Sequence, residues 1–166
     1  MEDYRTKIRN QRALKEAVEM VKKQGKKVVF TNGCFDILHL GHVRYLHEAR
    51  NCGDYLVVGV NSDRSVKAIK GENRPVISEQ ARAELLAALC FVDGVVIFDE
   101  EHPLALIMDL LPQVLVKGAD WQEHEIVGAD LIRKGGGEIV RIPLVRHWST
   151  SGMIRRIVDL HSQGVR

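Results

Sequence analysis

Short runs of hydrophobic residues recur along the whole chain and are separated by longer amphipathic stretches. The run at residues 55–61, YLVVGVN, is continuous in apolar residues, as parallel strands covered on both faces tend to be. Similar runs give five expected strands, at residues 26–33, 55–61, 94–98, 114–118 and 138–144.

Between the strands, hydrophobic positions recur near helical spacing. Ile8, Leu14 and Val18 mark one face of an amphipathic helix expected over about residues 6–23. Ser78 is a suitable N-cap for a second helix, over residues 78–92. The other expected helices lie at residues 42–51, 65–76 (a short helix that runs into a basic loop), 103–111, 125–135 and 151–163.

Strands that alternate with helices over the whole length imply right-handed crossovers and a parallel sheet. We therefore expect one doubly wound, Rossmann-like α/β domain, in which a single parallel sheet is flanked by helices. Residues 1–25 would form an N-terminal helix packed on this domain, which itself covers residues 26–166.

The topology also predicts where a site should lie. In doubly wound sheets, ligands bind beyond the carboxyl ends of the strands, where the winding direction reverses. Residues 31–42, residues 61–63, residues 117–121 and the segment after Leu144 all follow expected strands. We expect these four segments to share one rim of the sheet.

Composition and charge exclude several classes of protein. The chain has 166 residues, of which 45% are hydrophobic and 28% charged, and a formal charge of +2. These values are ordinary for one globular domain, and they give no argument for a nucleic-acid or membrane partner. The N-terminal residues lack the apolar core of a signal peptide. Three cysteines without paired spacing suggest neither disulfides nor a zinc site, so a cytoplasmic location is expected.

The segment TNGCFDILHLGH, residues 31–42, carries the strongest chemical signal. Gly41 lets the chain turn tightly into a helix, and His42 would lie in its first turn, where free N–H groups attract anions. His39 can reach the same volume from the loop. A phosphate site with two imidazole donors is one interpretation, and packing or surface roles are the other. Zinc is less favoured because no further ligands stand at a recognisable spacing.

This segment resembles the H-x-G-H signature of a superfamily of nucleotidyltransferases. Within that superfamily the chain is most similar to the bacterial D-glycero-D-manno-heptose 1-phosphate adenylyltransferases. Four further stretches support the resemblance in the same order along the chain: VGVNSDRSVKAIKGENRPV, RAELLAAL followed by FVD, LLPQVLVKGADW and GGGEIVRIP.

The resemblance implies that AMP passes from ATP to a sugar 1-phosphate, which yields an ADP-sugar and pyrophosphate. Two alternatives stay open. One is a related transferase with another acceptor, such as glycerol 3-phosphate with CTP. The other is a nucleotide-binding regulator without turnover, which the presence of both histidines disfavours. Magnesium is expected to accompany the nucleotide, and a homodimer is expected from the family.

The resemblance also assigns candidate residues to roles. The catalytic candidates are His39, His42 and Lys117. The candidates for binding the nucleotide are Thr31, Asn32, Gly33, Cys34, Phe35, Gly41, Asp120, Trp121, Ser149, Thr150 and Ser151. The candidates for binding the acceptor are Asn61, Asp63, Lys67, Lys70, Arg74 and Arg82.

Several of these residues have an equally plain structural interpretation. Asp36, in the same loop, is expected to shape the loop by accepting hydrogen bonds rather than to bind a metal. Arg82 would otherwise form a surface salt bridge, and Trp121 would otherwise lie in the core. The hydroxyl groups of Ser149 and Thr150 could simply cap a helix.

The chain departs from the related cytidylyltransferases in one position that bears on phosphate binding. Those enzymes carry an arginine five residues before the Ser-Thr pair, where this chain has Leu144. Arg146 lies close by in the sequence, although its spacing differs. The departure weakens the case for a cytidylyltransferase and leaves one phosphate contact unassigned.

Overall fold

The sheet of this protein has five parallel strands in the order β3-β2-β1-β4-β5. A computed structural model describes residues 3–162. The strands are β1 (Val28–Gly33), β2 (Tyr55–Asn61), β3 (Gly94–Phe98), β4 (Val114–Gly118) and β5 (Glu138–Ile142). This order is that of a doubly wound sheet whose direction reverses between β1 and β4, so the predicted Rossmann-like class is confirmed.

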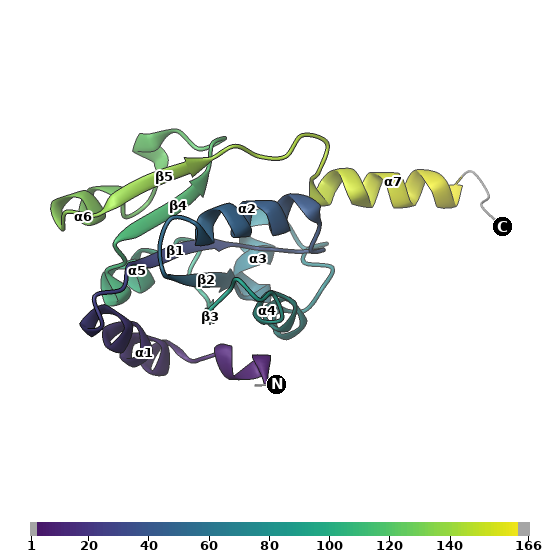
Figure 1. Cartoon of the computed structure of the whole chain (residues 1–166). Helices are drawn as coiled ribbons and strands as arrows, with labels where there is room; N and C mark the ends of the chain where they lie inside the picture. The colour runs from purple at the N-terminus through teal and green to yellow at the C-terminus, as the bar shows by residue number, and fades with distance from the viewer. Residues whose placement is uncertain (1–2, 163–166) are drawn as a thin grey trace.

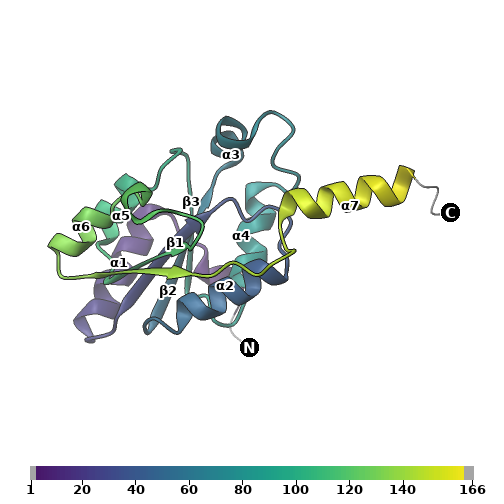
Figure 2. The same cartoon turned by 90° about the horizontal axis from the view of Figure 1, so that it is seen from above.

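Helices cover both faces of the sheet (Figures 1 and 2). On one face lie α2 (Leu40–Arg50) and α4 (Glu79–Ala87), and on the other lie α1 (Gln11–Lys23), α5 (Leu104–Leu110) and α6 (Ala129–Lys134). The remaining elements are η1 (Tyr4–Lys7), α3 (Asp63–Lys70), η2 (Glu123–Glu125) and α7 (Thr150–Ser162).

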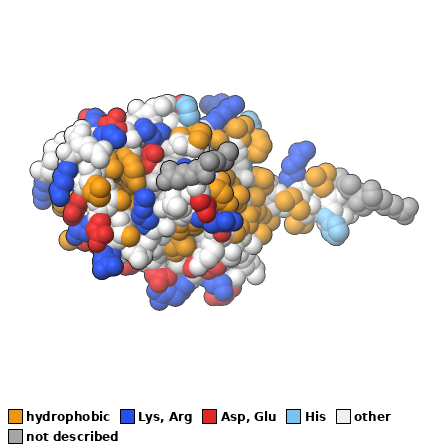
Figure 3. All heavy atoms as spheres, turned by 60° about the horizontal axis from the view of Figure 1, so that its bottom comes forward, with side chains coloured by type: hydrophobic (Ala, Val, Ile, Leu, Met, Phe, Trp, Pro, Cys, Tyr) orange, Lys and Arg blue, Asp and Glu red, His pale blue; other side chains and the backbone are white. Residues whose placement is uncertain are grey.

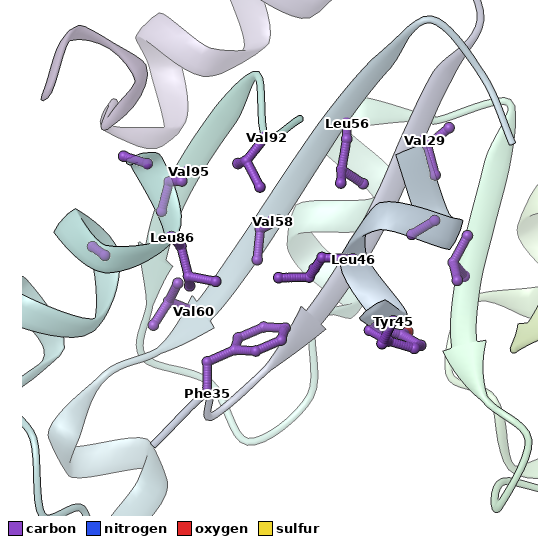
Figure 4. Packing of buried hydrophobic residues seen from close by; sticks show 14 of the residues in the cluster. Val29, Phe35, Tyr45, Leu46, Leu56, Val58, Val60, Leu86, Val92 and Val95 are labelled. Atoms are coloured by element: carbon purple, nitrogen blue, oxygen red, sulfur yellow. The ribbon is translucent and has the colours of Figure 1, made fainter. Parts of the chain in front are cut away.

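Two hydrophobic cores, one on each face, hold these layers together. Successive strand residues alternate between them: Val29 faces α2 and α4, whereas Val28 and Phe30 face α1 and α5. Figure 4 shows the first core, in which Leu46 of α2 and Leu86 of α4 pack over the sheet. Burial on both faces explains why the strand sequences are almost continuously apolar.

The N-terminal helix begins later than the sequence pattern predicts. Residues 6–23 were expected to be one helix, but α1 begins at Gln11, after the N-cap Asn10, whose side chain accepts a hydrogen bond from the backbone N–H of Ala13. Ile8 is instead extended and forms an isolated parallel bridge with Val95 of β3. The apolar side chain of Ile8 thus packs against the core beside the edge strand β3 and is not part of the helix.

Strands β1 and β4 are paired over a much shorter length than their neighbours. Six residue pairs join β1 to β2, whereas only Val29–Val114 and Phe30–Leu115 join β1 to β4. Beyond Phe30 the two strands are no longer paired by the backbone. This parting lies at the point where the sheet reverses, which is where the topology predicts a ligand site.

Helix α7 stands clear of the rest of the molecule (Figures 1 and 3). None of its residues is buried, and Ile157, Val158 and Leu160 are exposed by 59%, 55% and 45%. Within the described part of the chain, no helix is both long and apolar enough to cross a membrane.

Candidate active site

A cavity of about 510 Å³ opens at the carboxyl ends of the strands. Its wall contains residues from the loop after β1, the tip of β2, the loop after β4 and the segment that leads into α7. The four segments that were expected to share one rim therefore do so. The parting of β1 from β4 lies at the centre of this rim.

The cavity gathers most, but not all, of the residues proposed from the sequence. Those that line it are Asn32, Gly33, Cys34, Phe35, His39, Gly41, His42, Asn61, Lys70, Arg74, Lys117, Asp120, Trp121, Ser149, Thr150 and Ser151. Four candidates are absent from the lining: Thr31, Asp63, Lys67 and Arg82. Thr31 is completely buried, and its hydroxyl lies 2.8 Å from the hydroxyl of Tyr45.

His39 and His42 form a stacked pair at the start of α2. Their ring centroids are 3.7 Å apart and the rings are nearly parallel, with an angle of 13°. His39 is the N-cap of α2, and its Nδ1 accepts a hydrogen bond of 3.3 Å from the backbone N–H of His42. Because Nδ1 is the acceptor, the proton of neutral His39 belongs on Nε2, where it can be donated to a ligand.

Burial keeps both imidazoles uncharged at neutral pH. Burial, and then the neighbouring His39, lower the pKa of His42 to about 4. Burial also lowers the pKa of His39. Nδ1 of His42 is buried and has no hydrogen-bond partner among the described residues. A buried polar atom without a partner is costly, and proteins retain such atoms mainly where function requires them.

Gly41 is required at its position by the crowding around the pair. A Cβ atom on Gly41 would lie 3.0 Å from the ring of His39 and 3.1 Å from Cβ of Trp148. Replacing Gly41 by alanine would therefore require the imidazole of His39 or the side chain of Trp148 to shift by a few tenths of an ångström. The glycine of the motif thus permits close packing of the segment before α7 against the start of α2.

Asp36 joins the loop after β1 to the loop that precedes α4. Its carboxylate accepts hydrogen bonds from the backbone N–H groups of Val76 and Ile77 and from Nε of Arg74, the last at 2.7 Å. Burial raises the pKa of Asp36, but these donors outweigh that effect and hold its pKa below the usual value. The expected structural role of Asp36 is therefore seen directly in these contacts.

The N-terminus of α7 is tied to the same loop. The hydroxyl of Thr150 donates a hydrogen bond of 2.7 Å to the backbone carbonyl of Asp36. Ser149 caps the helix, since its hydroxyl accepts a hydrogen bond of 3.1 Å from the N–H of Gly152. The N-termini of α2 and α7 consequently open onto one cavity, and helix N-termini attract anions.

Lys117 enters the cavity from the end of β4. Its ammonium group donates a hydrogen bond to the side-chain oxygen of Asn32 on β1 and lies 5.7 Å from the centre of the Trp121 ring. Burial lowers the pKa of Lys117 to about 8, although nearby Asp120 opposes the shift. Trp121 is 46% exposed, so the alternative of a core tryptophan is wrong.

Arg82 lies beneath the cavity and not in its wall. Its side chain has no exposed surface, which contradicts the alternative of a surface salt bridge. The guanidinium donates to the carbonyl oxygens of Ile77 and Cys34 and to Asp63, the last at 2.8 Å. Arg82 and Asp63 thus support the loop of the histidine motif from below.

The structure also brings into the cavity residues that the sequence analysis missed. Glu101 and His102 follow β3, and Trp148 precedes the Ser-Thr pair. The rule that sites lie after strands, applied to β3, would have indicated the first two. The carbonyl of neighbouring Glu100 accepts hydrogen bonds from the side chains of Asn61 and Ser65. Asn61 therefore helps to hold this loop in place.

The missing arginine is replaced by an apolar residue. Leu144 lines the cavity and is 53% exposed, whereas Arg146 is not part of the lining. Among the described residues, no group of three or more histidine, cysteine, aspartate or glutamate side chains is arranged to hold a metal ion. The positive groups that remain in the wall are Lys70, Arg74 and Lys117.

Sequence comparisons agree with this geometry. The family model described as cytidylyltransferase-like matches residues 30–141. The chain is 51% identical, over 162 residues, to the bifunctional protein HldE of Syntrophotalea carbinolica, and 54% identical, over 149 residues, to that of Campylobacter concisus. These matches cover 98% and 89% of this chain. They cover 33% and 31% of the relatives, so the chain spans about a third of their length.

Solved structures give the same fold. A lipopolysaccharide core biosynthesis protein from Thermoplasma volcanium superposes with a TM-score of 0.60 at 32% identity, over 73% of this chain and 98% of that protein. A pantoate-beta-alanine ligase from Francisella tularensis gives a TM-score of 0.61 over 94% of this chain and 76% of the ligase. Its identity is 16%, so the second likeness concerns the fold alone.

Proposed function

Because the chain belongs to the cytidylyltransferase-like family, we propose that it is a nucleotidyltransferase that moves AMP from ATP to a sugar 1-phosphate. The observation that carries the proposal is the convergence of two helix N-termini on one cavity with His39, His42 and Lys117. Such an arrangement suits a chain of phosphates, because every group named is a hydrogen-bond donor or a positive charge.

The reaction needs no nucleophile from the protein. A phosphate oxygen of the sugar phosphate attacks the α-phosphorus of ATP, a new P–O bond forms, and the bond to the β-phosphate breaks as pyrophosphate leaves. The task of the protein is to align the reactants and to stabilise the charge that develops on the phosphoryl oxygens. Magnesium enters this proposal as part of the substrate MgATP, and no step is assigned to it.

The histidines fit the part of donors and not of general bases. A pKa of about 4 makes His42 a weak base that stays neutral at physiological pH, and its neutral ring still carries one N–H donor. His39 carries its donor on Nε2, since Nδ1 is used inside the helix cap. Ser149 and Ser151 add hydroxyl groups at the start of α7, where the hydroxyl of Thr150 already donates to Asp36, and Lys117 adds a positive charge at the end of β4.

The two ends of the cavity suggest where each substrate lies. Trp121, Asp120 and Leu144 line the end near β4 and β5, where an exposed aromatic ring and an apolar side chain suit the flat base of a nucleoside. Lys70 and Arg74 line the end that follows β2, where the charge of Lys70 and those N–H groups of Arg74 that do not bind Asp36 suit the acceptor phosphate.

We further propose D-glycero-D-manno-heptose 1-phosphate as the acceptor and ADP-heptose, for lipopolysaccharide core synthesis, as the product. Support comes from the five ordered sequence stretches and from the relatives named bifunctional protein HldE. The solved lipopolysaccharide core biosynthesis protein from Thermoplasma volcanium adds to it.

The proposed assembly is a homodimer. The apolar side chains of α7, such as Ile157 and Leu160, are left uncovered, and a second copy of the chain would bury them. Light scattering of the purified chain tests the dimer, and the mass of a monomer at micromolar concentration would contradict it.

Pyrophosphate release with magnesium tests the reaction. ATP and CTP would each be offered with D-glycero-D-manno-heptose 1-phosphate and with glycerol 3-phosphate. We expect release only with ATP and the heptose phosphate. Release with CTP and glycerol 3-phosphate would overturn the assignment of the substrates, and silence with every pair from folded protein would overturn the proposed function.

Variants of the two histidines test the mechanism. Replacing His39 or His42 by alanine should lower turnover about 10²- to 10³-fold, as expected for the loss of a donor used in the transition state. His47→Ala is the matched control, because His47 lies on the same helix with an exposed side chain and is not part of the cavity wall. Near-normal turnover in both variants would contradict the assigned role.

A further inference from the structure

The point where β1 and β4 part is bridged by side chains. Backbone pairing between the two strands ends at Phe30 and Leu115. Two residues further along each strand stand Asn32 and Lys117, and the ammonium of Lys117 donates a hydrogen bond to the side-chain oxygen of Asn32. The Lys117–Asn32 hydrogen bond thus joins β1 to β4 at the position where the next alternate residue pair would stand if backbone pairing continued.

The surroundings of Lys117 leave its ammonium group few other partners. The Trp121 ring lies 5.7 Å away on one side, and Asp120 is near enough to influence its charge. The carboxylate of Asp120 turns back toward Gly118, where a Cβ atom would lie 2.3 Å from Oδ1 of Asp120. Among the described residues, Lys117 forms no salt bridge within 4.0 Å.

We propose that Asn32 is the positioning residue for Lys117, holding its ammonium group over the parting of β1 and β4 while leaving its whole charge to the triphosphate. The inference rests on the proposed function, and it replaces direct contact of the Asn32 side chain with the nucleotide. An amide oxygen serves this purpose better than a carboxylate, because it accepts the hydrogen bond without neutralising the ammonium.

The proposal makes the protonation of Lys117 depend on residue 32. Asn32→Ala removes the acceptor that favours the charged ammonium, so the midpoint of its titration should fall by about one pH unit. Asn32→Asp places a negative charge against the ammonium, so the midpoint should rise by at least about as much. A merely structural role of Asn32 would not produce shifts of opposite sign.

Labelling of Lys117 measures this midpoint without any substrate. The wild-type chain and both variants would be exposed briefly to acetic anhydride across pH 6 to 11, and the acetylated fraction of Lys117 would be read by peptide mass spectrometry. The wild-type midpoint is expected at about 8. Lys134, which is exposed on α6, is the internal control and should label identically in all three proteins.

The outcomes separate this proposal from the proposed function. Opposite shifts in the two variants support it, whatever the transferase assay gives, because the labelling requires no turnover. Unchanged midpoints in both variants, or shifts in the same direction, overturn it. If circular dichroism shows that Asn32→Ala does not fold, Asn32→Ser is used in its place. The proposal is then overturned if Lys117 has the same titration midpoint in Asn32→Ser, in Asn32→Asp and in the wild type.

Discussion

Replacing Arg82 by methionine removes a fully buried charged group. The guanidinium has no exposed surface and donates three hydrogen bonds, to the carbonyl oxygens of Ile77 and Cys34 and to the carboxylate of Asp63. Methionine fills much of the same volume but donates nothing. The variant therefore isolates the loss of these bonds from the creation of a large cavity.

The magnitude of the loss follows from the fate of each acceptor. The carbonyl oxygens of Ile77 and Cys34 are left without this donor, at a cost of about 1–3 kcal/mol each. Asp63 is 38% exposed in its side chain, so it regains water and adds at most about 1 kcal/mol. We therefore expect Arg82→Met to lower the free energy of unfolding by about 3–5 kcal/mol.

Urea denaturation followed by circular dichroism measures this free energy. Arg64→Met is the control, because Arg64 also pairs with an aspartate, at 3.2 Å, but its side chain is 78% exposed. The control should lose about 0–1 kcal/mol. A loss in Arg82→Met that is within about 1 kcal/mol of the control would refute the reasoning that buried acceptors determine the cost.

Three further predictions concern His42, Thr150 and Gly53. Burial lowers the pKa of His42 in the folded protein to about 4, so on acidification the unfolded chain takes up this proton at a higher pH than the folded protein does. The free energy of unfolding should therefore fall as the pH drops from about 6.5 to about 4. Measuring that free energy across this pH range should show a smaller decrease in His42→Asn. Thr150→Val removes the hydrogen bond of 2.7 Å to the carbonyl of Asp36 and should lower turnover, whereas Thr150→Ser should restore it, in the pyrophosphate assay. Gly53→Ala should destabilise the protein by about 1–3 kcal/mol in thermal unfolding, because a Cβ atom at this position would lie 2.8 Å from the backbone oxygen of Lys27. Gly135→Ala is the control and should be tolerated, because no atom would lie nearer than 3.5 Å to its Cβ.

Strands β2, β3 and β4 were predictable from the sequence because they are buried on both faces. The runs at β2, β3 and β4 were expected at residues 55–61, 94–98 and 114–118, which are the observed bounds. Their apolar residues are continuous, so the local pattern alone defines the ends. The start of α1 was not predictable in this way. Ile8 fits the helical pattern of hydrophobic residues, but it lies outside the helix and forms a bridge with Val95 of β3.

The candidate site was predictable where it depends on the order of strands, and less so where it depends on burial. Strand order brings the ends of β1 and β4 together, which is why His39 and Lys117 meet in one cavity. The burial of Arg82 depends on acceptors at Cys34 and Asp63, which lie 48 and 19 positions away, as well as on a nearby one at Ile77. No local pattern reports such a convergence, so a surface contact seemed equally suitable.

The hydrogen bond between Thr150 and Asp36 joins residues that are 114 positions apart. It attaches a segment that forms part of the cavity wall but not of the hydrophobic cores. Ile142 is the last residue along the described chain that is buried in a hydrophobic core. The described residues after Ile142 thus add no buried side chain to either hydrophobic core, although Ser149 and Thr150 line the cavity. The segment that carries Ser149 and Thr150 therefore contributes to the binding site without contributing to the core, so changes in α7 should affect the cavity more than the stability of the sheet.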